Sequence, residues 1–221
     1  MKIQILEGVE GAKQATGTTV VIDVLRAATV SAYLLNQGVE SILPVATAQE
    51  AFTHKANDPE ILLVGENEGI KIEGFDIGNS PSEIRSLSHL SGKRVVHRSS
   101  TGTQGLVNAT KATEIIFGSF VTTSAILNHI HSTQPETVTF VPMYALEDQL
   151  FAEYMQAKLL NQTAATIDQI TSQLEKHEWL KQSFLNPDND NFPKDDFYLS
   201  LEIDAFDFFP SLVNGEIVKT S

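Results

Sequence analysis

Asp23 and Arg26 stand where a β-branched run ends and a helical pattern begins, and they are the first residues whose types and spacing could do chemistry. The run Thr19–Val24 predicts a buried strand, and Ala27–Asn36 predicts the helix that follows it. A carboxylate at the C-terminal end of a strand lies where open α/β sheets bind ligands. Asp23 is therefore suited to ligate Mg²⁺, which takes oxygen ligands, or to attack phosphorus directly.

Both residues also have structural interpretations. Asp23 is equally suited to cap the following helix or to pair with Arg26 inside the core. The planar guanidinium of Arg26 matches phosphate or carboxylate with two hydrogen bonds, and its alternative is the same ion pair. The sequence leaves these alternatives open.

Hydroxyl side chains gather after a second predicted strand, Arg94–Val96. The segment Ser99-Ser100-Thr101-Gly102-Thr103 precedes a helix, and hydroxyls with backbone N–H groups at a helix N-terminus bind anions well. The segment is not a P-loop, because it lacks the Gly-Lys-Ser/Thr ending. A plain turn is the alternative interpretation.

Carboxylates crowd two further regions. The stretch from Gly69 to Pro81 is long and Gly-rich, and such loops are more often functional than idle. Four acidic residues lie in this stretch or just before it: Glu66, Glu68, Glu73 and Asp76. Their charges repel one another unless a cation or Lys71 compensates. A solvated acidic loop is the alternative, favoured for Glu68. Glu147 and Asp148 lie in the first turn of a predicted helix, where negative charge is favourable anyway.

Two other polar groups carry less information. The six histidines show no metal-ligand spacing, and only His97, at the end of a strand, is a candidate acid or base. The segment Asp188-Asn189-Asp190-Asn191 lacks the Gly and the final Glu of a calcium loop.

The bulk composition excludes several classes of protein. The chain has 221 residues and a formal net charge of −13, which repels polyanions, so no nucleic acid and no anionic membrane is expected as a partner. Without cysteine there is no disulfide, thiolate metal site or cysteine nucleophile. No apolar run approaches the roughly 18 residues of a membrane span, and the first residues lack a signal-peptide pattern. We expect a cytoplasmic protein.

Strands alternate with helices, which predicts an α/β fold with a mostly parallel sheet flanked by helices. The order of strand, turn, helix and strand over residues 21–43 is echoed over residues 95–116, which suggests two related βαβ-type halves. The loops after Val24, Val96 and Val141 would then meet at one edge of the sheet. We expect a single unit over residues 1–221, with a candidate sub-domain boundary near residues 88–93.

Three further segments carry predictions about the fold. The glycines between residues 8 and 18 predict a connection without regular structure. Residues 166–179 have the pattern of one helix, and Val213-Asn214-Gly215-Glu216 has that of a closing hairpin.

Seven sequence blocks together resemble one family. They are Val-Ile-Asp-Val-Leu-Arg-Ala-Ala-Thr at 21–29, Gly65-Glu66, the segment 69–81, Ser-Ser-Thr-Gly-Thr at 99–103, Gly118-Ser119-Phe120, Leu146-Glu147-Asp148 and Asp204-Ala205-Phe206-Asp207. They fall in order across nearly the whole chain, and Lys-Ile-Glu-Gly-Phe-Asp-Ile-Gly-Asn-Ser-Pro at 71–81 is the most specific. The family is the 2-phosphosulfolactate phosphatases of the coenzyme M pathway, the ComB-like proteins.

The resemblance implies an α/β fold peculiar to the family and a Mg²⁺-dependent phosphatase that acts on a small anionic phosphoester. Its substrate would be a 2-phospho-carboxylate such as 2-phosphosulfolactate, and its products a 2-hydroxy acid and phosphate. From motif position and residue chemistry we assign Mg²⁺ to Asp23, Glu66 and Asp76, and catalysis to Asp23, Arg26, Glu147 and Asp148. The expected substrate-binding residues are Arg26, Lys71, Asn79, Ser80, Ser99, Ser100, Thr101 and Thr103.

Two positions depart from the usual pattern of the family. Asn67 stands where an arginine is common, and Thr101 stands where an asparagine is common. These departures motivate an alternative function, a non-catalytic protein that binds a phosphoester on the same scaffold. A phosphotransferase is a third interpretation, and the assembly is left open, with a homodimer among the options.

Overall fold

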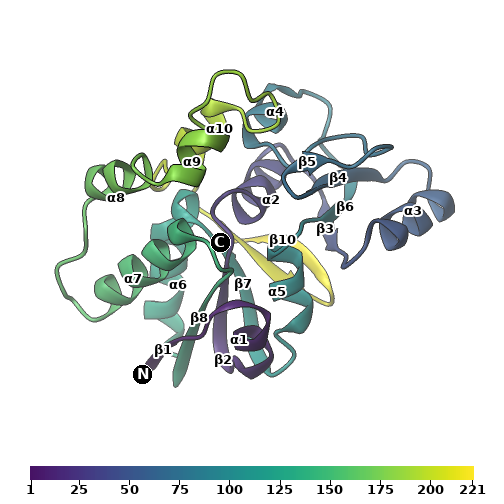
Figure 1. The fold of residues 1–221 in the computed structure, drawn as a ribbon. Helices are drawn as coiled ribbons and strands as arrows, with labels where there is room; N and C mark the ends of the chain where they lie inside the picture. Colours follow the sequence, from purple (N-terminus) through teal and green to yellow (C-terminus); the bar gives the residue numbers. More distant parts are fainter.

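The structure is a computed structural model that describes residues 1–221, and it contains ten strands and ten α-helices (Figure 1). The strands are β1 (Lys2–Ile5), β2 (Gly17–Ile22), β3 (Ser41–Pro44), β4 (Leu62–Asn67), β5 (Ile70–Lys71), β6 (Arg94–Arg98), β7 (Ala112–Gly118), β8 (Thr137–Pro142), β9 (Phe209–Val213) and β10 (Glu216–Thr220). The helices are α1 (Gly8–Gln14), α2 (Ala27–Asn36), α3 (Ala48–Asn57), α4 (Pro81–Ser86), α5 (Gly102–Asn108), α6 (Thr123–Thr133), α7 (Leu146–Leu159), α8 (Ile167–Leu174), α9 (Glu178–Ser183) and α10 (Lys194–Ser200). A 3₁₀ turn, Phe120–Thr122, precedes α6.

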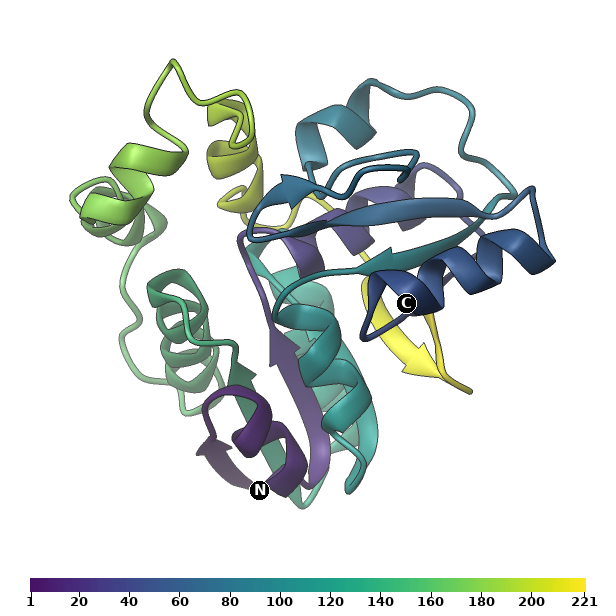
Figure 2. The same cartoon turned by 45° about the vertical axis from the view of Figure 1, so that its right-hand side comes forward.

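One sheet runs through the molecule in the order β1-β8-β2-β7-β9-β10-β3-β6-β4-β5. It consists of two parallel blocks, one of β1, β8, β2 and β7 and one of β3, β6 and β4. The antiparallel hairpin β9–β10 joins them, because β9 pairs with β7 and β10 pairs with β3. Figure 2 shows the blocks from a second side, with the yellow hairpin beside α5 and below α3. The predicted α/β class with a mostly parallel sheet is confirmed.

The two echoing units exist, but each spans both blocks instead of forming one half. The chain passes from β2 through α2 to β3, and from β6 through α5 to β7. β2 pairs with β7 and β8, whereas β6 pairs with β3 and β4. Neither helix therefore returns the chain to a strand beside the one it left. The two crossings instead bring the C-terminal ends of β2 and β6 close together.

β2 is covered on both faces, which explains its unbroken β-branched run. Val20 and Ile22 belong to the core cluster that also holds Phe140 and Phe151, whereas Val21 belongs to the cluster under α2. In α2 every residue from Ala27 to Leu35 is buried. The strand and helix that flank Asp23 are thus fixed by packing on all sides.

Two expected segments differ from the prediction. Residues 8–18 contain α1, because Gly8 and Gly11 serve close packing and do not interrupt the helix. A Cβ on Gly8 would lie 2.0 Å from the Tyr144 ring, and one on Gly11 would lie 2.5 Å from the Leu6 backbone. Residues 166–179 form α8 and the start of α9, since α8 ends at Leu174 and the chain turns before resuming.

The closing hairpin is confirmed, and Asn214 and Gly215 both adopt the positive φ angles that its two-residue turn requires. The predicted boundary near residues 88–93 stays a prediction, and that segment connects α4 with β6. None of the helices combines the length and the apolar character needed to cross a bilayer.

Candidate active site

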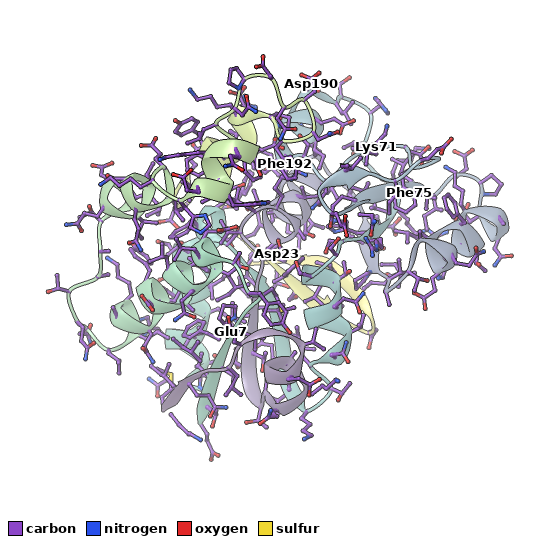
Figure 3. All side chains as sticks on the ribbon, viewed as in Figure 1. Glu7, Asp23, Lys71, Phe75, Asp190 and Phe192 are labelled. Carbon is purple, nitrogen blue, oxygen red and sulfur yellow. The ribbon has the colours of Figure 1, made fainter.

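Three loops meet where the C-terminal ends of β2, β6 and β8 come together, as the sequence predicts. Asp23 follows β2, Thr101 follows β6, and Asp148 lies just after β8 in the first turn of α7. The Thr101 hydroxyl donates to Asp23 Oδ2 at 2.8 Å, and the backbone N–H of Val24 donates to Asp148 Oδ1 at 2.7 Å. Figure 3 shows Asp23 at the centre of the molecule.

Both carboxylate oxygens of Asp23 are held. Oδ1 accepts from the backbone N–H of Ala27 in the first turn of α2 at 2.9 Å, and Oδ2 accepts from Thr101. Burial raises the pKa of Asp23, the two hydrogen bonds oppose this shift, and the negative charge of Glu66 adds to it. Asp23 therefore ties its helix in place and also faces the site.

A cavity of about 510 Å³ opens beside Asp23, within the size range of small-molecule sites. One part of its wall is acidic and is made by Asp23, Glu66, Glu68 and Glu147. Another part is apolar and is made by Leu25, Met143, Tyr144, Leu146, Trp179 and Phe192. The remaining wall includes Arg26, Asn79, Ser100, Thr101 and His177.

Arg26 does not pair with Asp23, which corrects the structural alternative suggested by the sequence. Its Nη1 lies 2.9 Å from Asp196 Oδ2 in a fully buried ion pair, and its Nη2 donates to the Gly69 carbonyl at 2.8 Å. The guanidinium also lies over the Phe192 ring, 5.0 Å from the centroid. Arg26 thus joins the loops around Gly69 and Phe192 at the cavity edge, and both of its terminal nitrogens take part in hydrogen bonds.

Sequence reasoning missed Asp196. This side chain is completely buried and, besides Arg26, accepts hydrogen bonds from the Ser80 hydroxyl at 2.9 Å and from the Ser82 hydroxyl at 2.6 Å. Ser80, predicted to bind substrate, instead holds Asp196 and caps α4. The only local signal was an Asp pair after Pro193, which is also the ordinary start of a helix.

Glu147 and Asp148 are both buried, with different surroundings. Burial, followed by the charge of Asp23, raises the pKa of Glu147 to about 7. Burial and the charges of Asp23 and Glu147 raise the pKa of Asp148 well above its ordinary value. Glu147 lines the cavity, whereas Asp148 lies behind its wall and binds the Val24 peptide. Asp148 is thus placed to position the segment after Asp23.

The hydroxyl segment divides into two pairs. Ser100 donates its backbone N–H and its hydroxyl to Glu66, at 2.5 and 3.1 Å, so these two side chains hold each other at the cavity wall. Ser99 and Thr103 are buried and exchange hydrogen bonds at the start of α5. For Ser99 and Thr103 the structure supports the turn interpretation, whereas Ser100 and Thr101 line the cavity.

Two predicted residues, Asp76 and Lys71, lie outside the cavity. Asp76 accepts from the Leu63 N–H at 2.8 Å and pairs with Lys55 at 3.1 Å, outside the cavity. Lys71 is exposed and lines a neighbouring polar depression. In Figure 3 it lies well to one side of Asp23.

Asn79 lines the cavity, and its Oδ1 lies 3.0 Å from His97 Nε2. His97 is fully buried, and burial lowers its pKa to about 4. It therefore stays neutral and supports Asn79, so the expectation of an acid or base at the sheet edge is wrong for His97.

The donor chemistry of the acidic wall fits Mg²⁺, although no group of three or more His, Asp or Glu side chains is arranged to hold a metal ion. Mg²⁺ usually binds through one or two carboxylates together with phosphate oxygens of the substrate. Asp23 and Glu147 offer such a pair, because burial and then the charge of Asp23 raise the pKa of Glu147, and a bound cation would offset the charge of both. Asp76 lies outside this arrangement.

Comparisons with known proteins agree on one family. Residues 3–215 match the family described as 2-phosphosulpholactate phosphatase. A protein of Carboxydothermus hydrogenoformans named probable 2-phosphosulfolactate phosphatase is 38% identical over 167 residues, which cover 73% of this chain and 69% of that protein. A protein of the same name from Thermotoga petrophila is 30% identical over 215 residues, which cover 91% of each.

Proposed function

The chain belongs to the 2-phosphosulpholactate phosphatase family, and on that premise we propose that it hydrolyses a small 2-phospho-carboxylate in the cavity beside Asp23. The membership confirms the resemblance drawn from the sequence blocks and makes the chain a phosphoric monoester hydrolase. The proposed products are inorganic phosphate and the 2-hydroxy acid, and the proposed cofactor is Mg²⁺.

The observation that carries the proposal is the position of Asp23. Its carboxylate lies at the end of the central strand of a parallel block, on the wall of the one cavity that also contains Glu147, Asn79 and Thr101. Ligands of open α/β sheets bind outside the carboxyl ends of the strands. The family blocks at 21–29, 65–66, 99–103 and 146–148 thus converge on one site.

The charge of the cavity supports a requirement for a cation. Four carboxylates line the wall, whereas Arg26 is the only lysine or arginine there and is already paired with Asp196. A phosphate dianion would be repelled by such a wall. Bound Mg²⁺, held by Asp23 and Glu147, would neutralise phosphoryl oxygens and orient the ester for in-line attack.

The residues have distinct roles in the proposed hydrolysis. A water molecule adds its oxygen to phosphorus, the bond from phosphorus to the ester oxygen breaks, and the proton of the water passes to that leaving oxygen. Glu147, whose pKa burial raises to about 7, would give up its proton when the cation binds. The Asn79 amide and the Thr101 hydroxyl line the wall where phosphoryl oxygens would bind.

Asp23 itself is a second possible attacking group. Attack by its carboxylate would form an aspartyl phosphate, and water would then release phosphate from it. A single turnover of a ³²P-labelled ester, quenched in acid, distinguishes the routes. Attack by Asp23 leaves transient ³²P on the protein that Asp23→Asn abolishes, whereas direct attack by water leaves none.

The experiment that tests the proposal is phosphate release from 2-phospholactate by the wild-type chain, with Mg²⁺ and with a chelator. We expect steady release that the chelator abolishes and added Mg²⁺ restores. Tight binding of the ester by calorimetry without any release would support the non-catalytic alternative. Transfer of phosphate to an added alcohol would indicate a phosphotransferase.

A further inference from the structure

The aromatic part of the cavity wall comes from a different region of the chain than the acidic part. Asp23, Glu66 and Glu147 lie at the ends of strands β2 and β4 and at the start of α7. Trp179 lies on α9, and Phe192 lies in the segment that leads to α10. Figure 1 shows α9 and α10 packed beyond the ends of the strands, and Figure 3 shows Phe192 on their side of Asp23. The cavity therefore has an ionic end and an apolar end.

Trp179 and Phe192 form a connected aromatic surface. Their ring centroids are 5.8 Å apart with an edge-to-face angle of 84°, and Phe184 packs against both rings from behind. Trp179 nevertheless remains 49% exposed. Trp179 is one of the residues that line the cavity, so part of this exposed surface faces it.

Phe192 is held firmly in place at the cavity edge. A Cβ on Gly69 would lie 2.0 Å from its ring, so only a glycine admits the ring there. The Phe192 ring also contacts the Arg26 guanidinium, which is bound to Asp196 and to the Gly69 carbonyl. The apolar end is thus formed by packed rings, and the one Lys or Arg side chain on the cavity wall is already paired with Asp196.

The substrate named for the relatives does not match such an end. 2-Phosphosulfolactate carries its phosphoryl and carboxylate groups on C2 and a sulfonate on C3. The two groups on C2 can share the ionic end with a cation, and the C3 substituent must then extend away from it. At the apolar end a sulfonate would lose much of its hydration, and the one arginine on the wall is already paired with Asp196, which leaves His177 as the only other basic side chain there.

We propose that the chain prefers 2-phospho-carboxylates whose C3 substituent is an apolar ring, which stacks against Trp179 and Phe192. This preference rests on the proposed function, because it concerns the substrate of the same site. The hydrolysis is the step given above and needs no further reactant. The wall of Leu25, Met143 and Leu146 completes the enclosure of the ring.

The test compares 2-phospho-3-phenyllactate, 2-phospholactate and 2-phosphosulfolactate at saturating Mg²⁺, both as substrates and as ligands in calorimetry. We expect kcat/KM and affinity to be greatest for the phenyl ester, by roughly tenfold or more over the methyl ester. If the chain binds the phenyl ester best but hydrolyses none of the three, the proposed activity fails and the preference stands. If the sulfonate ester is bound or hydrolysed best, the preference is overturned.

Variants of the wall locate the effect. Trp179→Ala is expected to reduce the preference for phenyl over methyl by roughly tenfold, measured as the ratio of the two kcat/KM values so that a loss common to both esters cancels. Tyr198→Ala is the control, because Tyr198 is a similarly exposed aromatic on α10 that does not line the cavity. Trp179→Lys should raise the ratio of sulfonate to phenyl hydrolysis, a gain that misfolding cannot produce. An unchanged ratio in both Trp179 variants would overturn the proposal.

The neighbouring polar depression provides the competing explanation. Lys71 lies there without an ion-pair partner, and Arg26 and Asn79 border both hollows. If the sulfonate reached Lys71, Lys71→Met would lower kcat/KM for the sulfonate ester alone, by tenfold or more. We expect equal effects on all three esters, and a selective loss would contradict the preference for an apolar substituent.

Discussion

The buried ion pair of Arg26 with Asp196 holds the cavity edge together, and Asp196→Asn tests this directly. Arg26 is 4% exposed and Asp196 is fully buried, so the substitution leaves a buried guanidinium without its counter-charge. Removing one partner of such a pair typically costs about 3–5 kcal/mol. Asparagine keeps the volume and one carbonyl for Ser80 and Ser82, so we expect a loss of about 3 kcal/mol in the free energy of unfolding.

The measurement is urea unfolding of the wild type, Asp196→Asn, Arg26→Met and the double variant. The double variant should be more stable than the sum of the single losses by about 1–3 kcal/mol, because the two side chains interact. Asp195→Asn is the matched control, since Asp195 is the exposed neighbour on the same helix, and it should stay within roughly 0.5 kcal/mol of the wild type. Equal losses in the two Asp variants, or strict additivity in the cycle, would refute a structural role for the pair.

Three further predictions concern pH, metal binding and packing. The pKa of His97 is about 4 in the folded chain and 6.5 ordinarily, so the unfolded chain takes up the proton first as the pH falls. The free energy of unfolding should therefore drop by about 3 kcal/mol between pH 6.5 and pH 4. Urea unfolding at pH 7 and at pH 4.5 should show this loss in the wild type, and His97→Gln should remove it. Since Glu147 must lose its proton to hold a cation, calorimetry should show Mg²⁺ affinity about tenfold lower at pH 6 than at pH 8, and a much flatter dependence in Glu147→Gln. Gly69→Ala should destabilise the chain by about 1–3 kcal/mol and displace Phe192, because Gly69 has a φ of +83° and no room for a Cβ. Thermal unfolding measures this loss. Gly92→Ala is the control, because φ is also positive at Gly92 but the space around it is open, so the difference between the two losses gives the cost of the steric clash.

The parts of the fold that depend on local pattern could be predicted from the sequence. The α2 range Ala27–Asn36 follows from its helical pattern and stop signal, and the hairpin at Asn214-Gly215 follows from turn chemistry. The meeting of the loops after β2, β6 and β8 followed from alternating strands and helices alone. The crossing of both echoing units between blocks could not be predicted, because β9 and β10 come from the far end of the chain and insert between β7 and β3.

The site shows the same division. Asp23 was found because its signal is local, a carboxylate between a strand and a helix. The partner of Arg26 was missed because Asp196 lies 170 positions away in the sequence and resembles an ordinary helix start. Asp76 was wrongly assigned to the same metal site as Glu66. Closeness of acidic residues along the sequence does not determine which way each side chain points, and the carboxylate of Asp76 pairs with Lys55. Trp179 gave no signal, because α8 and α9 read as one helix.

The central claim is that Asp23 is the chemical centre of the site, and the rate of phosphate release by Asp23→Asn tests it most directly. The substitution preserves shape, so the chain should fold, while the charge that would hold Mg²⁺ or attack phosphorus is lost. Asp76→Asn is the matched control, because Asp76 is a carboxylate of another family block, 69–81, and lies outside the cavity. We predict that Asp23→Asn loses at least about a hundredfold in kcat for 2-phospholactate at saturating Mg²⁺, whereas Asp76→Asn keeps a rate near that of the wild type. Full Mg²⁺-dependent release by Asp23→Asn would contradict the account.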